Sequence, residues 1–181
     1  MVIRITYFVH GTTTDNEQGL SSGWSDVGLS ELGVRQSKEL GPLTEDRHFD
    51  VVFTSDLKRA VESAKLTWGD KYKIIPDARL RECNYGDLNG KPSEMVEPMQ
   101  ERSITTPMPG GESYEMVKER VAGFLADLKR DYDGKSVAIV AHKAPQLALD
   151  MLLKGMTWEE AFAADWRKKG KWQPGWEYTL G

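Results

Sequence analysis

The chain has 181 residues, of which 39% are hydrophobic and 29% are charged, and its formal net charge at pH 7 is -4. This length predicts one domain over residues 1–181, and the composition is typical of a folded protein rather than a disordered or membrane-spanning one. The negative net charge argues against a nucleic acid as the main partner, because such a surface needs an excess of Lys and Arg. The single cysteine, Cys83, excludes an internal disulfide and fits a reducing compartment.

The sequence also predicts a cytoplasmic protein. His10 interrupts the N-terminal apolar run MVIRITYFV before a secretory signal peptide would be complete. The other apolar runs are shorter than the ~20 residues that a membrane-spanning helix needs. We therefore expect no membrane partner.

Short apolar runs alternate along the chain with segments of helical periodicity. The runs are apolar on both faces and rich in β-branched residues, as in the buried strands of parallel sheets. In chain order we predict a strand at 2–9, a helix at 31–40, a strand at 50–53, a helix at 57–68 capped by Ser55, a strand at 72–75, a helix at 114–128, a strand at 136–141, a helix at 145–153 and a helix after Thr157. This alternation predicts an α/β fold with a mostly parallel sheet.

Two segments depart from this alternation. Residues 80–112 contain eight glycines and prolines and no long helical period, which predicts a functional connection such as a lid or substrate loop. The segment from about 165 to 181 has too many aromatic residues for a disordered tail, and we expect it to pack on the domain, at the mouth of a site or in a homodimer contact. Its basic residues, Arg167, Lys168 and Lys169, are expected to form a solvated helix face.

Three residues that suit anion chemistry come directly after predicted strands. His10 and His142 end the first and last strands, and Arg59 lies in the first turn of the helix after the strand at 50–53. Carboxyl ends of parallel strands meet at one sheet edge, where ligands bind in α/β folds. Spacing alone leaves open that the histidines are structural and that the arginine is a solvated helix residue.

Other site chemistries find less support. His48 and Cys83 show no close ligand spacing with the two strand-end histidines, so we expect no metal. The signatures of a nucleophilic serine, a P-loop and a dinucleotide-binding loop are also missing from the sequence.

Six segments, taken in order, are similar to motifs of one family. They read FVHGTTTDN, DVGLSELGVRQ, VVFTSDLKRAVESA, LRECNYGDLNG, PMPGGES and VAIVAHKAPQ. Together they resemble the histidine phosphatase (phosphoglycerate mutase-like) superfamily, from the N-terminus to the helix after His142. The resemblance implies a phosphoglycerate mutase-like fold, a three-layer α/β/α sandwich. It also implies a metal-independent phosphatase without a cofactor, acting on a small phosphorylated substrate.

The resemblance assigns roles by position. His10 is expected to be the nucleophile that forms a phosphohistidine, and His142 and Arg59 are expected to stabilise phosphoryl oxygens. Glu82 is expected to protonate the leaving oxygen and then to take a proton from the attacking water. The expected phosphate or substrate contacts are Gly11, Asn16, Ser22, Gly23 and Lys143.

The sequence departs from the family motif at Val9, where relatives have an arginine. Losing one oxyanion donor typically costs on the order of 10²–10³ in rate. Lys143 follows His142 where relatives usually have glycine, so one hypothesis is that it replaces the lost arginine as a point charge. The alternative is a solvated surface lysine.

Three functions remain open at this stage. The leading one is a phosphomonoesterase that hydrolyses a small metabolite. A phosphoglycerate mutase-like transferase is the second, although mutases carry a longer insertion between the YGDLNG and Gly-Glu-Ser segments. The third is a weak or inactive member that binds a phosphorylated ligand, for which Val9 is the argument.

Overall fold

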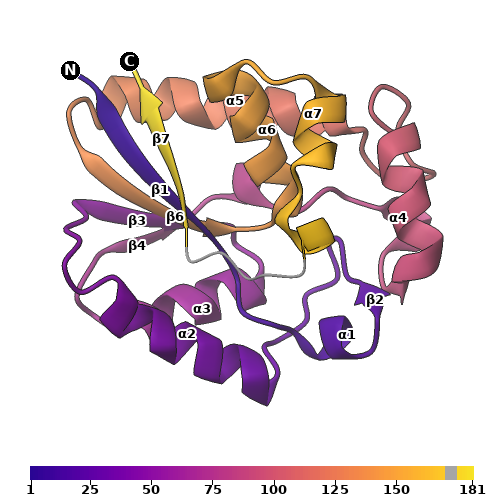
Figure 1. Ribbon diagram of the computed structural model, residues 1–181, viewed down its shortest axis with the longest axis horizontal. Coiled ribbons are helices and arrows are strands. Elements are labelled where there is room, and N and C mark those ends of the chain that lie inside the picture. Colours follow the sequence, from indigo (N-terminus) through magenta and orange to yellow (C-terminus); the bar gives the residue numbers. More distant parts are fainter. Residues whose placement is uncertain (170–174) are drawn as a thin grey trace.

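The computed structural model describes residues 1–169 and 175–181 and has a mixed, mostly parallel sheet at its centre (Figure 1). Its five strands lie in the order β4-β3-β6-β1-β7. The strands are β1 (Ile3–Val9), β3 (Val51–Thr54), β4 (Ile74–Pro76), β6 (Ser136–Ala141) and β7 (Trp176–Leu180). All neighbours are parallel except β7, which runs antiparallel to β1 at the edge. The predicted α/β fold is confirmed.

Helices cover both faces of the sheet. On one side lie α2 (Glu31–Leu43) and α3 (Lys58–Trp68), and on the other α5 (Tyr114–Asp131), α6 (Lys143–Lys154) and α7 (Trp158–Ala163) (Figure 1). Alternation along β1 explains the two layers, because successive side chains of a strand point to opposite faces. Phe8 belongs to the apolar cluster of α2 and α3, whereas Tyr7 and Val9 belong to that of α5 and α6.

Smaller elements surround the end of the sheet where β1 and β6 finish. The short strands β2 (Leu20–Ser21) and β5 (Lys91–Pro92) pair with each other, and α1 (Thr14–Glu17) and α4 (Ser93–Arg102) flank them. Three 3-10 turns complete the list, at Ala78–Leu80, Gly86–Leu88 and Trp166–Lys169.

Helix α4 corrects the prediction for residues 80–112, which gave no helix there. The helix is short, contains Pro98 and buries little besides Val96 and Gln100, so its apolar periodicity is weak. The helix is held by its contacts with β2 and β5 rather than by an amphipathic pattern of its own.

Other boundaries shift by a few residues. Helix α6 begins at Lys143, two positions before the predicted start, and Pro145 lies in its first turn as expected. Ser55 does not cap α3 in the usual way, because the N-cap is Leu57 and no side chain closes it. The Ser55 hydroxyl accepts the Leu57 N–H at 3.2 Å and also contacts His142.

The aromatic C-terminal segment packs on the domain through β7. Tyr178 is buried and Trp176 is partly buried against the apolar cluster on the α5 and α6 side of the sheet. Trp172 lies outside the described residues. No helix in the described parts of the chain is long and apolar enough to cross a membrane.

Candidate active site

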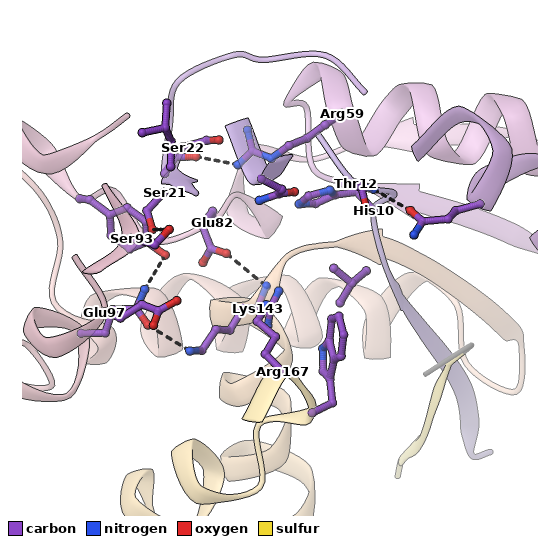
Figure 2. Close-up of a pocket in the computed structure, with 18 residues that line it drawn as sticks. His10, Thr12, Ser21, Ser22, Arg59, Glu82, Ser93, Glu97, Lys143 and Arg167 are labelled. Carbon is purple, nitrogen blue, oxygen red and sulfur yellow. Dashed lines mark hydrogen bonds between the residues drawn. The ribbon is translucent and has the colours of Figure 1, made fainter. Parts of the chain in front are cut away.

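A cavity of about 360 Å³ opens beside the ends of β1 and β6 (Figure 2). Its walls come from distant parts of the chain: the end of β1, the loop around β2, the start of α3, the segment before α4 and α4 itself, the start of α6, and the turn at 166–169. This is the sheet edge at which the sequence placed the site. Seven of the nine predicted site residues line the cavity: His10, Asn16, Ser22, Gly23, Arg59, Glu82 and Lys143.

His10 follows the last residue of β1 and presents its ring to the cavity. Its Nδ1 lies 2.7 Å from the carbonyl oxygen of Gly11. Because a carbonyl can only accept, Nδ1 carries the hydrogen and Nε2 keeps a lone pair. Burial and the nearby Arg59 cation lower the pKa of His10 to about 3, although the bond to Gly11 opposes this shift. The imidazole is therefore neutral near pH 7.

His142 lies behind His10 and is fully buried, so it does not line the cavity. The Tyr7 hydroxyl holds its backbone on both sides, donating to the His142 carbonyl at 2.6 Å and accepting the His142 N–H at 3.0 Å. Its Nε2 lies 2.6 Å from Ser55 Oγ. Its Nδ1 has no hydrogen-bond partner among the described residues, which is uncommon for a buried polar atom.

Arg59 reaches the cavity from the first turn of α3 and is almost completely buried. Its guanidinium donates to the carbonyl oxygens of Ser25 at 2.9 Å and Gly23 at 2.7 Å. Gly23 needs to be glycine, because its φ is +53° and an added Cβ would lie 2.0 Å from Asn89 Oδ1. The loop and the arginine thus fix each other.

Glu82 lies across the cavity from α3, with its carboxylate at the N-terminus of α6 (Figure 2). Oε1 accepts the N–H groups of Cys83 at 2.8 Å and Ala144 at 3.0 Å, and Oε2 accepts that of Lys143 at 3.2 Å. Backbone groups therefore hold the carboxylate in place, and one oxygen has only a single, longer contact.

An ion pair behind the cavity supports the Glu82 loop. Arg120 on α5 pairs with Glu112 at 2.9 Å and donates to the carbonyl oxygens of Glu82 at 2.9 Å and Arg79 at 2.6 Å. The Trp24 indole donates to the same Glu82 carbonyl at 2.7 Å. Sequence reasoning missed this support, although Glu112 belongs to the Gly-Glu-Ser motif.

The small polar residues differ in how they reach the cavity. Asn16 closes the capping box of α1 with Thr13, and Ser22 donates to Asp15 at 2.8 Å. Gly11 lies outside the cavity wall, where its N–H donates to Ser63 Oγ at 2.9 Å. It packs so closely against α2 that a Cβ would lie 2.5 Å from the Gly33 carbonyl oxygen.

Lys143 lines the cavity, but its ammonium group is already paired. Nζ lies 2.7 Å from Asp165 Oδ2 and 3.0 Å from Gln100 Oε1, above the ring of Phe162. The hypothesis that Lys143 replaces the motif arginine as a point charge did not include these partners.

Arg167 is the cationic wall residue that sequence reasoning missed. It was expected on a solvated helix face with Lys168 and Lys169, and it is exposed, but it also lines the cavity together with Trp166. Its spacing holds no signal, and the 3-10 turn that carries it is held at its start by Asp165, which accepts the Arg167 backbone N–H at 3.1 Å. The other wall residues not predicted are Thr12, Leu20, Ser21, Gln36, Tyr85, Ser93, Glu97 and Gln100.

Two further residue types bear on the chemistry. Within the described residues, His, Cys, Asp and Glu side chains form no group of three or more placed to hold a metal ion. Cys83 is buried beside the site, and this burial raises the pKa of its thiol far above the usual range, so it is not a reactive thiolate.

Comparison with known proteins connects this chain to a family. Residues 7–172 match the profile of the histidine phosphatase superfamily (branch 1). A 2,3-bisphosphoglycerate-dependent phosphoglycerate mutase from Cytophaga hutchinsonii is 36% identical over 172 residues, covering 86% of this chain and 79% of the mutase. The uncharacterised phosphatase PhoE of Bacillus subtilis is 34% identical over 146 residues, covering 77% of this chain and 72% of PhoE.

A solved structure has the same fold. The mycobacterial glucosyl-3-phosphoglycerate phosphatase in complex with VO3 superposes with a TM-score of 0.78 at 26% identity, covering 88% of this chain and 86% of that one. Both phosphatases and mutases are therefore similar to this chain.

Proposed function

Because the chain belongs to branch 1 of the histidine phosphatase superfamily, we propose that it hydrolyses a small phosphomonoester through a phosphohistidine on His10. One observation carries the proposal. The hydrogen bond between His10 Nδ1 and the Gly11 carbonyl leaves Nε2 with a lone pair at the cavity wall. Arg59 and Glu82 line the same cavity, so a cation and an acid–base group accompany the nucleophile.

In the first step, His10 Nε2 attacks phosphorus as the bond from phosphorus to the leaving oxygen breaks. Arg59 stabilises the charge on the equatorial oxygens, because its bonds to Gly23 and Ser25 hold it in a fixed position. Glu82, in its protonated form, gives its proton to the leaving oxygen. In the second step, Glu82 takes a proton from water, which attacks the phosphohistidine and releases inorganic phosphate.

His142 is proposed to supply a further N–H donor to the phosphoryl group, from the side of His10 that faces away from the cavity. Ser55 Oγ accepts the Leu57 N–H, so its own hydrogen is free to be donated to His142 Nε2. Nδ1 then carries the imidazole hydrogen, and it is the nitrogen that has no partner among the described residues. We propose that this N–H donates to an oxygen of the phosphoryl group bound on His10, a contact that requires the buried ring to become accessible when substrate binds.

A phosphoglycerate mutase activity is the second candidate, since mutases are among the relatives above 30% identity. The wall of the cavity argues against it. Glu97 on α4 adds a carboxylate to the pocket, where it repels the carboxylate of a phosphoglycerate. A weak or inactive phosphate-binding member is the third candidate, because Val9 replaces the motif arginine.

The decisive test is hydrolysis of an aryl phosphate, with EDTA present, by wild type, His10→Gln and the control His48→Gln. We expect wild type and the control to be active and His10→Gln to lose at least about 10³-fold in rate. Equal rates in all three would show that His10 is not the nucleophile.

Two companion assays separate the other candidates. Interconversion of phosphoglycerates in the presence of 2,3-bisphosphoglycerate, at a rate exceeding hydrolysis, would favour the mutase. Binding of inorganic phosphate without turnover of any phosphoester in a broad panel would favour the inactive, ligand-binding member.

A further inference from the structure

The end of β1 lacks a cation next to the nucleophile. Val9 closes the strand and lines the cavity, but its side chain is apolar. Phosphoryl transfer places negative charge on three equatorial oxygens, and fixed positive donors stabilise it. Arg59 supplies one such cation, and two of its N–H groups are already used by the loop at 23–25. A second cation has to come from another segment.

Arg167 is in a position to be that cation. It lines the same cavity as Val9 and His10, and the neighbouring Trp166 does so too. Figure 2 shows Arg167 extending from the C-terminal segment into the pocket, whereas Arg59 enters from α3 on another side. Its charge is close enough to affect His10: together with burial and Arg59, it lowers the pKa of the His10 imidazole.

Neighbouring groups orient the guanidinium of Arg167 but do not use all of its N–H donors. Buried Asp165 accepts the Arg167 backbone N–H at 3.1 Å and lies 3.4 Å from Nη1. The guanidinium also lies above the Trp166 ring, 4.8 Å from its centroid. A guanidinium has five N–H donors. Within residues 1–169 and 175–181, Asp165 is its one hydrogen-bond partner, so most of its donors can still serve a ligand.

Lys143 makes this arrangement possible. Its ion pair with Asp165, at 2.7 Å, is shorter than the 3.4 Å contact of Arg167 with the same carboxylate. Asp165 is therefore neutralised mainly by Lys143, which leaves the Arg167 charge uncompensated toward the cavity. The bond from Lys143 to Gln100 further connects the C-terminal segment to α4.

We propose that Arg167 contacts the transferred phosphoryl group in place of the motif arginine, whose position Val9 occupies. We further propose that Lys143 positions Arg167 through Asp165. The inference rests on the proposed function, since it assigns a role within that site. Arg167 is then a catalytic residue, and Lys143 is a positioning residue rather than a phosphate ligand.

The test compares Arg167→Gln, Arg167→Lys and the control Lys168→Gln, whose lysine pairs with Glu101 and does not line this cavity. Aryl phosphate hydrolysis is measured together with vanadate binding by calorimetry. We expect Arg167→Gln to lose about 10²-fold in kcat/KM and to bind vanadate more weakly. Arg167→Lys should recover only part of the loss, because an ammonium lacks the planar fork. The control should match wild type.

Unchanged hydrolysis and vanadate binding in Arg167→Gln would overturn the Arg167 assignment while leaving the proposed function intact. If wild type hydrolyses nothing but its vanadate binding still depends on Arg167, the assignment stands and the proposed hydrolysis fails. A wild type that binds no vanadate would overturn both.

A double-mutant comparison tests the positioning role of Lys143. Lys143→Met should lower kcat/KM when Arg167 is present and should add little in the Arg167→Gln background. An equal loss in both backgrounds would mean that Lys143 acts on the substrate by itself, which would overturn the positioning role.

Discussion

The imidazole rings of His10 and His142 lie with their centroids 5.0 Å apart and their planes inclined by 58°. The register between β1 and β6 pairs Val9 with Ala141, so both histidines follow their strands at the same level of the sheet. Burial and the Arg59 cation lower the pKa of both rings. Two neutral imidazoles are compatible at this distance, whereas two imidazolium ions would repel each other.

The pH dependence of His10, the proposed nucleophile, is the first prediction. Because burial and Arg59 lower the pKa of His10 to about 3, its ring should stay neutral through the range where an ordinary histidine, with a pKa of about 6.5, takes up a proton. NMR titration of the His10 imidazole should show no midpoint near 6.5. A midpoint in that region would contradict the geometry of the site.

Stability should depend on pH for the same reason. Between pH 6.5 and about 3, the unfolded His10 is protonated and the folded one is not, so the unfolded state binds more protons. The free energy of unfolding should therefore be highest above pH 6.5 and should fall as the pH is lowered through this range. Denaturant unfolding of His10→Asn should show a shallower decline than wild type. An unchanged slope would contradict the prediction.

The acid–base role of Glu82 predicts a dependence on the leaving group. Glu82→Gln should lose about 10²–10⁴-fold in rate on an alkyl phosphate, whose leaving oxygen needs a proton. On an aryl phosphate, the rate of the first step should fall much less, because a phenolate leaves without taking up a proton. Single-turnover rates on both substrates measure the difference, with Glu119→Gln on the exposed face of α5 as control. Equal losses would indicate a purely structural Glu82.

The Tyr7 hydroxyl is predicted to be needed for the placement of His142. Tyr7→Phe removes the group that bonds both the N–H and the carbonyl of His142. It leaves the buried N–H unpaired and leaves the carbonyl with only the Gln146 N–H, at 3.4 Å. We expect a loss of about 1–3 kcal/mol in the free energy of unfolding, together with a lower kcat. Tyr132→Phe is the control, because the Tyr132 hydroxyl makes no hydrogen bond with the described residues. Unfolding in denaturant measures the first effect.

The ion pair between Arg120 and Glu112 is predicted to support the loop that contains Glu82. Both side chains are mostly buried, so Arg120→Met leaves a carboxylate without its charged partner and should cost about 3–5 kcal/mol in stability. The double variant with Glu112→Gln should recover part of this cost. A thermodynamic cycle from four unfolding curves measures the coupling, and a coupling near zero would contradict the prediction.

The local pattern of apolar residues was sufficient to predict the central strands of the fold. The strands ending at Val9 and Ala141 are uniformly apolar, so their burial and the adjacency of His10 and His142 followed from the alternation of strands and helices. The positions of Arg59 and Glu82 followed from motifs that resemble a family, and the cavity brings them together.

Other parts of the site depend on packing that no local period encodes. Helix α4 contains a proline and has little apolar periodicity, yet it supplies Glu97 and Gln100 to the wall. The direction of Arg167 depends on Asp165, which in turn pairs with Lys143 on a different helix. A basic residue in a polar stretch looks the same in sequence whether it faces water or a ligand.

The last strand of the sheet has a consequence for how the protein is made. On the ribosome, β1 is synthesised well before its two neighbours, which are β6, ending at Ala141, and β7, ending at Leu180. Until both have emerged, the strand that precedes His10 has an open edge that can pair with another nascent chain. Folding of this half of the sheet therefore depends on pairing strands that are far apart in the sequence, and chaperone protection of β1 is most useful before they pair.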